Sequence, residues 1–319
     1  VPHVVVTPPS PSKRLFLFAA YDKDCLIDDT LLYYLEALSK LGDIIFTMDN
    51  DTPAKEMAKL DRIPNILHAS AQRHGEYDFG SYKRGYIWAN DNQILDNYDW
   101  IYLTNDSVLG PMGDLESMLM NIESRGADCV GMVSNDPQLL PAHIQSWFVG
   151  LKRHVATSKF FRDFITNVAH QTDKLSVVYK YEVRMSQMLV ENGCTYAALF
   201  ENYGPTIYTN PHLALKAGVP FIKKLALGKL QELQLLYTYT GDRLVASILI
   251  YAVRHGIALS NKVQQPQYIR RFRITMMGLP ILTIYSQFDE SRKAYKLYIF
   301  DKIPIVKIWF QSNHSTQEA

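Results

Sequence analysis

The stretch RLFLFAAYDKDCLIDDTLLYYLEALSKLGDIIFTMD, residues 14–49, decides the fold class. It opens with an apolar run, residues 14–20, that predicts a buried strand, and it closes with a second such run, residues 43–49. Between them, leucines recur at helical spacing behind Asp28, which is a candidate N-cap. A strand, a helix and a second strand in this order predict a βαβ unit with parallel strands.

The same alternation continues through the first two hundred residues. Further strands are predicted at residues 65–70, 100–105 and 128–134, with one helix from about Ser81 and another over residues 114–125. We therefore expect an α/β domain with a mainly parallel sheet. Ligands of such sheets bind at the carboxyl ends of the strands, so the polar residues that follow each strand are the first candidates for a site.

The composition is ordinary for a globular protein, since 47% of the 319 residues are hydrophobic and 20% are charged. A formal net charge of +1 gives no global reason to expect nucleic acid as a partner. Cys25, Cys129 and Cys194 lie far apart without a CxxC spacing, which favours a reducing cytoplasm over disulfides or a zinc site. No apolar run approaches the ~20 residues that span a bilayer.

The two ends of the chain differ from its middle. Residues 1–12 are rich in Pro and Ser, so we expect a linker to other domains of a longer polypeptide. Residues 274–285 and 298–309 resemble each other and predict two β-hairpins after a basic, aromatic segment. We expect residues 231–319 to form a helical and β-hairpin extension that covers the sheet or makes peripheral contact with a membrane. Residues 13–230 remain as the α/β domain.

The predicted central strand ends at Asn105 and is followed by Asp106 and Ser107. A carboxylate in this place can hold a divalent cation that bridges a diphosphate, because hard cations prefer carboxylate oxygens. An Asx-turn or a helix cap explains the same residues without any ligand. The spacing alone leaves both interpretations open.

Two other loops carry groups that suit a nucleotide. After the first strand, Tyr21 can stack on a base and Asp22 can hydrogen-bond a base or ribose, although polar loops of this kind are ordinary. Residues 72–85, QRHGEYDFGSYKRG, combine glycines with Lys83 and other basic residues that suit phosphate oxygens. A helix entered at Gly80 would aim its N–H groups at an anion.

Residues 179–193, YKYEVRMSQMLVENG, predict a helix that is closed by Gly193. Glu182 lies in the first turn of this predicted helix, where the helix dipole favours a negative charge. The alternative role is that of a general base that takes a proton from an attacking hydroxyl. Further on, His212 offers a metal or phosphate ligand and Lys223 a phosphate contact, although a lone His is more often structural.

Five segments, in this order, resemble the rhamnan synthesis protein F family of bacterial polysaccharide glycosyltransferases over residues 14–227. They are HGEYDFGSYKRG (residues 74–85), YLTNDSVLGP (102–111), HIQSWF (143–148), YEVRMSQMLVENG (181–193) and NPHLALKAGVPFIKK (210–224). Their order is also similar to the GT-A layout, with an acidic motif at a central strand, a later acidic residue on a helix and a late His. The resemblance implies a GT-A-like αβα sandwich whose catalytic domain is residues 13–230.

The resemblance implies transfer of a sugar, a deoxyhexose such as rhamnose, from a dTDP, UDP or GDP carrier. The implied acceptor is a glycan or lipid-linked glycan of an O-antigen, capsule or lipopolysaccharide, at the inner face of the cytoplasmic membrane. Carried over by position, the implied roles are a catalytic base at Glu182, metal ligands at Asp106 and His212, donor contacts at Tyr21, Asp22, Asp78, Lys83, Asp106 and Lys223, and acceptor-side contacts at His143 and Trp147. Buried aromatic packing explains the last two equally well.

Two departures from the GT-A pattern stand out. The acidic motif usually has two carboxylates, but here Asp106 is the only one, so the expected Mn²⁺ or Mg²⁺ is weakly bound or dispensable. Arg73 and His74 stand where related enzymes often carry Asn, which puts nucleotide contacts there in question. Two other functions stay open: a sugar-phosphate transferase, whose product would keep a phosphate, and a non-catalytic glycan-binding or assembly module, which would not need Glu182.

Overall fold

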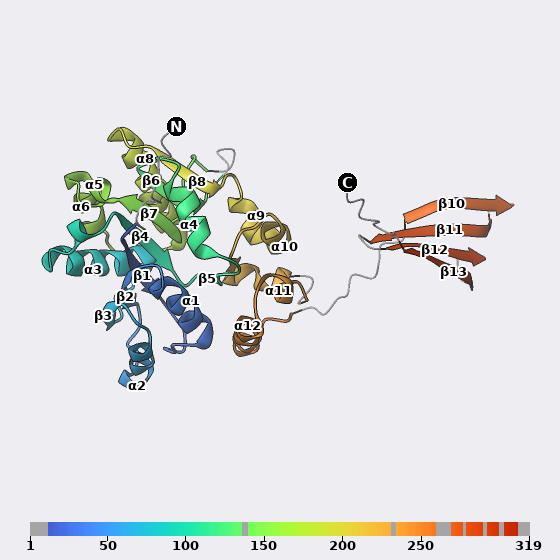
Figure 1. The fold of residues 1–319 in the computed structure, drawn as a ribbon, viewed down its shortest axis with the longest axis horizontal. Coiled ribbons are helices and arrows are strands. Elements are labelled where there is room, and N and C mark those ends of the chain that lie inside the picture. Colours follow the sequence, from blue (N-terminus) through green and yellow to red (C-terminus); the bar gives the residue numbers. More distant parts are fainter. Residues whose placement is uncertain are drawn as a thin grey trace, which may run out of the picture. The chain divides into compact units, whose positions relative to one another are not determined.

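The computed structural model describes residues 12–135, 140–230 and 234–259, and four strands between residues 269 and 311. The chain divides into two compact units between Ser260 and Asn261, and each is described here by itself (Figure 1). Residues 1–11 of the expected linker lie outside the described residues.

A seven-stranded sheet with the order β3-β2-β1-β4-β7-β6-β8 forms the centre of the larger unit. Only β7 runs against its neighbours, and every other pair is parallel. The strands are β1 (Arg14–Ala20), β2 (Asp43–Met48), β3 (Ile66–Ala71), β4 (Trp100–Asn105), β6 (Cys129–Val133), β7 (Phe148–Lys152) and β8 (Tyr196–Phe200). The expected α/β class with a mainly parallel sheet is confirmed.

Helices cover both faces of this sheet because its strands alternate between two hydrophobic cores. In β1, Phe16 and Phe18 belong to the core that includes α1 and α4, whereas Leu15 and Leu17 belong to the core that includes α3, α6 and α8. These helices are α1 (Asp29–Ser39), α3 (Tyr77–Asp91), α4 (Leu115–Glu123), α6 (Lys159–Thr166) and α8 (Arg184–Glu191). The predicted αβα sandwich is therefore confirmed (Figure 1).

Several helix ends follow the local sequence as predicted. Asp28 caps α1 by accepting a hydrogen bond from the backbone N–H of Leu31 at 3.0 Å. Gly193 follows α8 with a φ of 75°, a conformation that glycine adopts without steric cost.

Two helix starts were predicted wrongly. Helix α3 begins at Tyr77, four positions before the expected start near Ser81. The helix that carries Glu182 begins at α7 (Lys174–Val177), capped by Asp173, and continues through a π-helical segment, η3 (Val178–Val183), into α8. Glu182 therefore lies in the middle of a continuous helix, and the helix-dipole explanation of its charge is wrong.

A third hydrophobic core joins β5 (Val108–Leu109) and β9 (Ile222–Lys223) to α12 (Asp242–Arg254). Helix α12 thus packs within the unit that contains the sheet, while a functional boundary at residue 230 stays a prediction. The shorter elements of this unit are α2 (Ala54–Met57), η1 (Ala58–Arg62), η2 (Leu95–Asn97), α5 (Arg153–Ala156), α9 (Gly204–Thr209), α10 (Pro211–Lys216), η4 (Lys224–Lys229) and α11 (Gln234–Tyr239).

The smaller unit is a four-stranded antiparallel sheet with the order β10-β11-β12-β13. Its strands are β10 (Ile269–Met276), β11 (Leu279–Asp289), β12 (Arg292–Ile299) and β13 (Ile303–Gln311). The pairs β10–β11 and β12–β13 are the two hairpins that the internal repeat predicts. Contact of this unit with the main sheet or with a membrane stays a prediction. Among the helices of the described residues, none has the length and hydrophobicity of a membrane-spanning segment.

Candidate functional site

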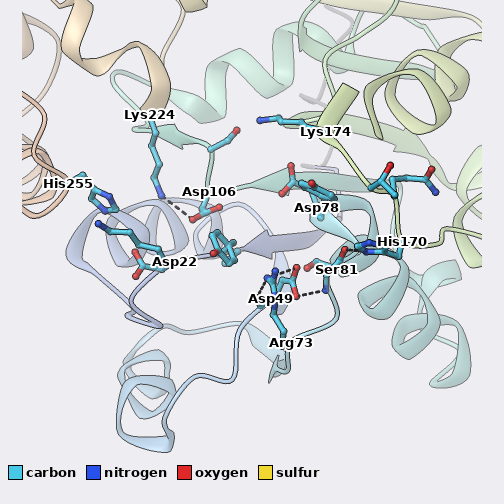
Figure 2. Close-up of a pocket in the computed structure, with 18 of the residues that line it drawn as sticks. Asp22, Asp49, Arg73, Asp78, Ser81, Asp106, His170, Lys174, Lys224 and His255 are labelled. Atoms are coloured by element: carbon cyan, nitrogen blue, oxygen red, sulfur yellow. Dashed lines mark hydrogen bonds and ion pairs between the residues drawn. The ribbon is translucent and has the colours of Figure 1, made fainter. Parts of the chain in front are cut away.

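A cavity of about 590 Å³ opens at the carboxyl ends of β1, β2 and β4 (Figure 2). Its walls come from segments that are far apart in sequence: the β1–α1 loop, the start of α3, the β4–β5 loop, the residues before α7, and α12 with its end. Of the predicted site residues, the cavity brings together Tyr21, Asp22, Asp78 and Asp106. This is the sheet edge at which the sequence places a ligand.

Two backbone contacts hold Asp106 in this wall. Its N–H donates to the carbonyl of Ala19 at 3.1 Å, which ties the loop after β4 to the end of β1. The N–H of Lys224 donates to the carbonyl of Ser107 at 2.9 Å, next to the antiparallel pair of β5 and β9. The side chain of Lys224 then places Nζ 3.0 Å from Oδ2 of Asp106.

Lys223 and Lys224 have different surroundings, because Lys223 ends strand β9 whereas Lys224 opens the 3₁₀-helix η4. Nζ of Lys223 donates to Oγ of Ser107 at 2.9 Å and lies 4.8 Å from the centre of the Trp147 ring. Lys223 is buried outside the cavity lining, and this burial lowers its pKa to about 7. The sequence predicts Lys223 as a donor contact, whereas the structure brings Lys224 to the cavity.

Lys224 is held as a cation. Burial alone would lower the pKa of Lys224, but the charge of Asp106 raises it above the ordinary value. The Tyr251 ring of α12 adds a cation–π contact, with its centre 5.1 Å from Nζ. A positive charge is therefore fixed at the cavity wall beside the predicted acidic motif.

Asp22 lines the cavity, but both of its carboxylate oxygens are engaged. Arg254 of α12 donates to Oδ1 at 2.9 Å and to Oδ2 at 2.6 Å, and it also reaches Asp28 at 2.7 Å. Burial would raise the pKa of Asp22, but the hydrogen bonds from Arg254 and the backbone outweigh it and lower the pKa. Asp22 thus holds the β1–α1 loop against α12.

Asp78 is the unusual carboxylate of the cavity. It accepts a hydrogen bond from Nδ2 of Asn105 at 2.9 Å, and no ion pair joins it to a cation within the described residues. Burial, together with the charge of Asp106, raises the pKa of Asp78 to about 6. Strongly perturbed carboxyl groups in cavities are typical of functional sites.

Glu182 lies outside the cavity lining, in the π-helical segment, a feature that is frequent at functional sites. Its Oε2 accepts from the N–H of Ser146 at 2.7 Å and from Oγ of Ser146 at 2.6 Å, while Nε2 of His143 is 3.4 Å from Oε1. Burial would raise the pKa of Glu182, but the hydrogen bonds from His143 and Ser146 lower it. The carboxylate is therefore ionised and firmly oriented.

The structure gives the two predicted acceptor-side residues buried positions. His143 is fully buried against Glu182, and Trp147, which is 2% exposed, donates from Nε1 to Gln145 at 2.9 Å. Their role toward an acceptor stays a prediction.

Lys83 and His212 do not line the cavity. Nζ of Lys83 donates to the carbonyl of Val168 at 2.6 Å and pairs with Glu76 at 2.8 Å, so its charge is used inside the fold. In the part of the chain that the structure describes, no three His, Cys, Asp or Glu side chains form a group that could hold a metal ion. Asp106 is instead paired with an ammonium group, which does not fit a resident divalent cation.

The sequence also misses residues that the cavity brings together. These are Asp49, His170, Lys174, Lys224, Tyr251 and His255, while Arg73, which the sequence offers as a phosphate contact, lines the cavity as well. The sequence did offer an indication for Lys224, because it is adjacent to Lys223, the predicted donor contact. Tyr251 and His255 had none, because they come from a helix more than two hundred residues after β1.

A match to a known protein family covers several of the segments that build the cavity, including the start of α3, the β4–β5 loop and Lys224. The model described as "Rhamnan synthesis protein F" matches residues 31–246, which is more than half of the chain. The chain belongs to this family. This membership confirms the expected resemblance to a family that is described by rhamnan synthesis.

Solved structures with a similar arrangement are distant in sequence. The mannosyltransferase Ktr4p from S. cerevisiae is 9% identical, with a TM-score of 0.35 over 56% of this chain and 66% of that chain, slightly under two thirds of its length. Core-mannan synthase A from Aspergillus fumigatus, in a Mn/GDP form, is 13% identical, with a TM-score of 0.34 over 59% of this chain and 71% of that one. A putative nucleotide-diphospho-sugar transferase from Desulfovibrio desulfuricans is 14% identical, with a TM-score of 0.35 over 60% and 81%. Similarity at this level assigns no substrate to the chain. No curated protein matches it significantly.

Proposed function

We propose that the chain transfers a sugar from a nucleoside diphosphate, bound in the cavity, to a hydroxyl group of a growing bacterial surface polysaccharide. One observation carries this proposal: separate segments of the family pattern supply Asp78, Asp106 and Lys224 to a single cavity at the carboxyl edge of the sheet. Its volume of about 590 Å³ lies within the range that is usual for small-molecule sites.

The cavity offers separate groups for the base and for the diphosphate of a nucleotide. Tyr21 is 48% exposed, and the guanidinium carbon of Arg73 lies 5.3 Å from the centre of its ring, so the pair presents flat surfaces on which a base can stack. Lys174 and Lys224 provide ammonium groups for the diphosphate. We assign the reacting sugar to the part of the cavity beside Asp78 and Asp106.

The proposed reaction is a single displacement. The acceptor oxygen attacks the anomeric carbon, the bond from that carbon to the diphosphate oxygen breaks, and the nucleoside diphosphate leaves with the electron pair. We assign the proton of the acceptor hydroxyl to Glu182, whose ionised carboxylate is oriented by Ser146 and His143. The assignment requires the acceptor to approach the 16% of the Glu182 side chain that is exposed. A single displacement inverts the anomeric centre.

The finer identity of the substrates belongs to the same proposal. The family description names rhamnan synthesis, which supports a deoxyhexose such as rhamnose on a dTDP carrier. A glycan or lipid-linked acceptor of an O-antigen, capsule or lipopolysaccharide would be met at the inner face of the cytoplasmic membrane.

The test is release of nucleoside diphosphate by the purified chain from dTDP-, UDP- and GDP-sugars, with a polysaccharide acceptor. Glu182→Gln should lower turnover by roughly 10²- to 10⁴-fold, the usual contribution of a general base, and leave donor affinity unchanged. Glu116→Gln, a change on the exposed side of α4, is the matched control and should keep full turnover.

Two results would contradict the proposal. Absence of both cleavage and nucleotide binding across the panel would favour a glycan-binding or assembly module. A product that retains a phosphate would favour a sugar-phosphate transferase.

A further inference from the structure

We propose that Lys224, assisted by Lys174, is the cation of the donor site and neutralises the diphosphate in place of a divalent metal ion. This inference rests on the proposed function and adds the way in which the leaving group is stabilised. It starts from the finding that Asp106, the residue expected to bind the metal, is paired with Lys224 at 3.0 Å.

The donor groups of Lys224 suit a phosphate. An ammonium group carries three N–H donors, and within the described residues Asp106 is the one hydrogen-bond acceptor of Nζ. Nζ therefore keeps donors for phosphate oxygens while one bond to Asp106 orients it. Since Lys224 lines the cavity, a bound diphosphate can reach them (Figure 2).

The charge of the site also suits this role. Lys174, at the start of α7, lines the same cavity, and no ion pair occupies it among the residues that the structure describes. Figure 2 shows Lys174 and Lys224 approaching from different sides of the cavity. Together the two ammonium groups carry the formal charge of one divalent cation, which can offset the negative charge that develops on the leaving diphosphate.

The position of Lys224 is fixed before any ligand binds. Its backbone N–H is bonded to Ser107, its Nζ to Asp106, and its charge lies against the ring of Tyr251. A side chain that is already ordered and partly desolvated loses little on binding, and its charge is poorly screened by salt. A metal ion at Asp106, by contrast, would first have to displace the ammonium group, and the described residues offer it no further cluster of ligands.

The experiment measures binding of UDP, GDP and dTDP to the whole chain by isothermal titration calorimetry, in Mn²⁺, in Mg²⁺ and in EDTA. We expect one nucleotide to bind with the same affinity in all three. Lys224→Met should weaken this binding by roughly 10- to 100-fold in EDTA, the size expected when a hydrogen bond to a charged group is lost. Lys216→Met, an exposed change on α10, should have no effect.

Two further variants keep the test independent of folding. Lys224→Met combined with Asp106→Asn removes both buried charges together, so it avoids an unpaired carboxylate and should show the same loss of affinity. Asp106→Asn alone separates the two possible cations by its effect on nucleotide affinity. If Lys224 is the cation, affinity is kept or increases, because the Asn oxygen can still accept the bond that orients Nζ while the negative charge that competes with the phosphate is removed. If Asp106 holds a metal, affinity falls.

Three outcomes would overturn the inference. Binding that is lost in EDTA and restored by Mn²⁺ would make the metal the required cation and leave the proposed function standing. Metal-independent binding that survives in both Lys224 variants would remove this residue from the role. No binding of any nucleotide under any condition would overturn the proposed function and this inference with it.

Discussion

Replacement of Asp78 by Asn is expected to stabilise the protein at neutral pH. Burial raises the pKa of Asp78 to about 6, against an ordinary value of 3.8. Ionisation of this group therefore costs more free energy in the folded protein than in the unfolded chain. The difference of about 2 pH units corresponds to about 3 kcal/mol in the free energy of unfolding at pH 8. For a unit of this size, that is a rise in Tm of roughly 6–12 °C.

The pH dependence of folding stability shows why the Asn variant should be more stable and not less stable. The unfolded chain ionises Asp78 near pH 3.8 and the folded protein near pH 6, so the wild type loses stability as the pH rises between these values. The Asn variant lacks this loss. Its advantage should therefore be small at pH 4 and complete by pH 7. The introduced amide oxygen can still accept the hydrogen bond of Asn105, so that contact is kept.

The assay is thermal unfolding, followed by circular dichroism, of wild type and Asp78→Asn at several pH values between 4 and 8. Asp61→Asn, a change of the same kind at an exposed position of η1, is the control and should leave Tm unchanged at every pH. A Tm difference for Asp78→Asn that is independent of pH, or a lower Tm at pH 8, would refute the reasoning.

Three further changes test other parts of the site. Arg254→Met should lower the free energy of unfolding by about 2–3 kcal/mol in urea titrations, because it leaves the carboxylate of Asp22 unpaired; an unchanged midpoint would contradict this. Tyr21→Ala should weaken nucleotide binding roughly 10-fold in calorimetry through loss of base stacking, and equal affinity would place the base elsewhere. Ser146→Ala should move the acidic limb of the pH–rate profile upward, because its hydroxyl helps to hold the pKa of Glu182 low; an unmoved limb would argue against Glu182 as the base.

The fold could be predicted where the local sequence is sufficient. The apolar runs of β1 and β2 and the cap at Asp28 depend on neighbouring residues alone, and each prediction is confirmed. The helix around Glu182 was placed too late because its start depends on Asp173 and on a π-helical segment, which has no clear sequence period.

The site could be predicted only in part, for a related reason. Asp106 follows from its place at the end of a predicted strand, whereas Asp78 is implied only by the family resemblance. The choice between Lys223 and Lys224 depends on strand β9 ending at Lys223 and on the helix η4 starting at Lys224, and the β5–β9 pairing that positions both joins residues more than one hundred positions apart. The pairing of Asp22 with Arg254 is longer still, and no local pattern signals it.

The central claim is that this cavity binds a nucleotide sugar through Lys224, and a crystal structure with a bound nucleoside diphosphate tests it most directly. Crystals grown with UDP, GDP or dTDP should show the base beside Tyr21 and a phosphate oxygen within hydrogen-bond distance of Nζ of Lys224. Density for the nucleotide at another place on the chain, or in this cavity with its phosphates directed away from Lys224, would contradict the account.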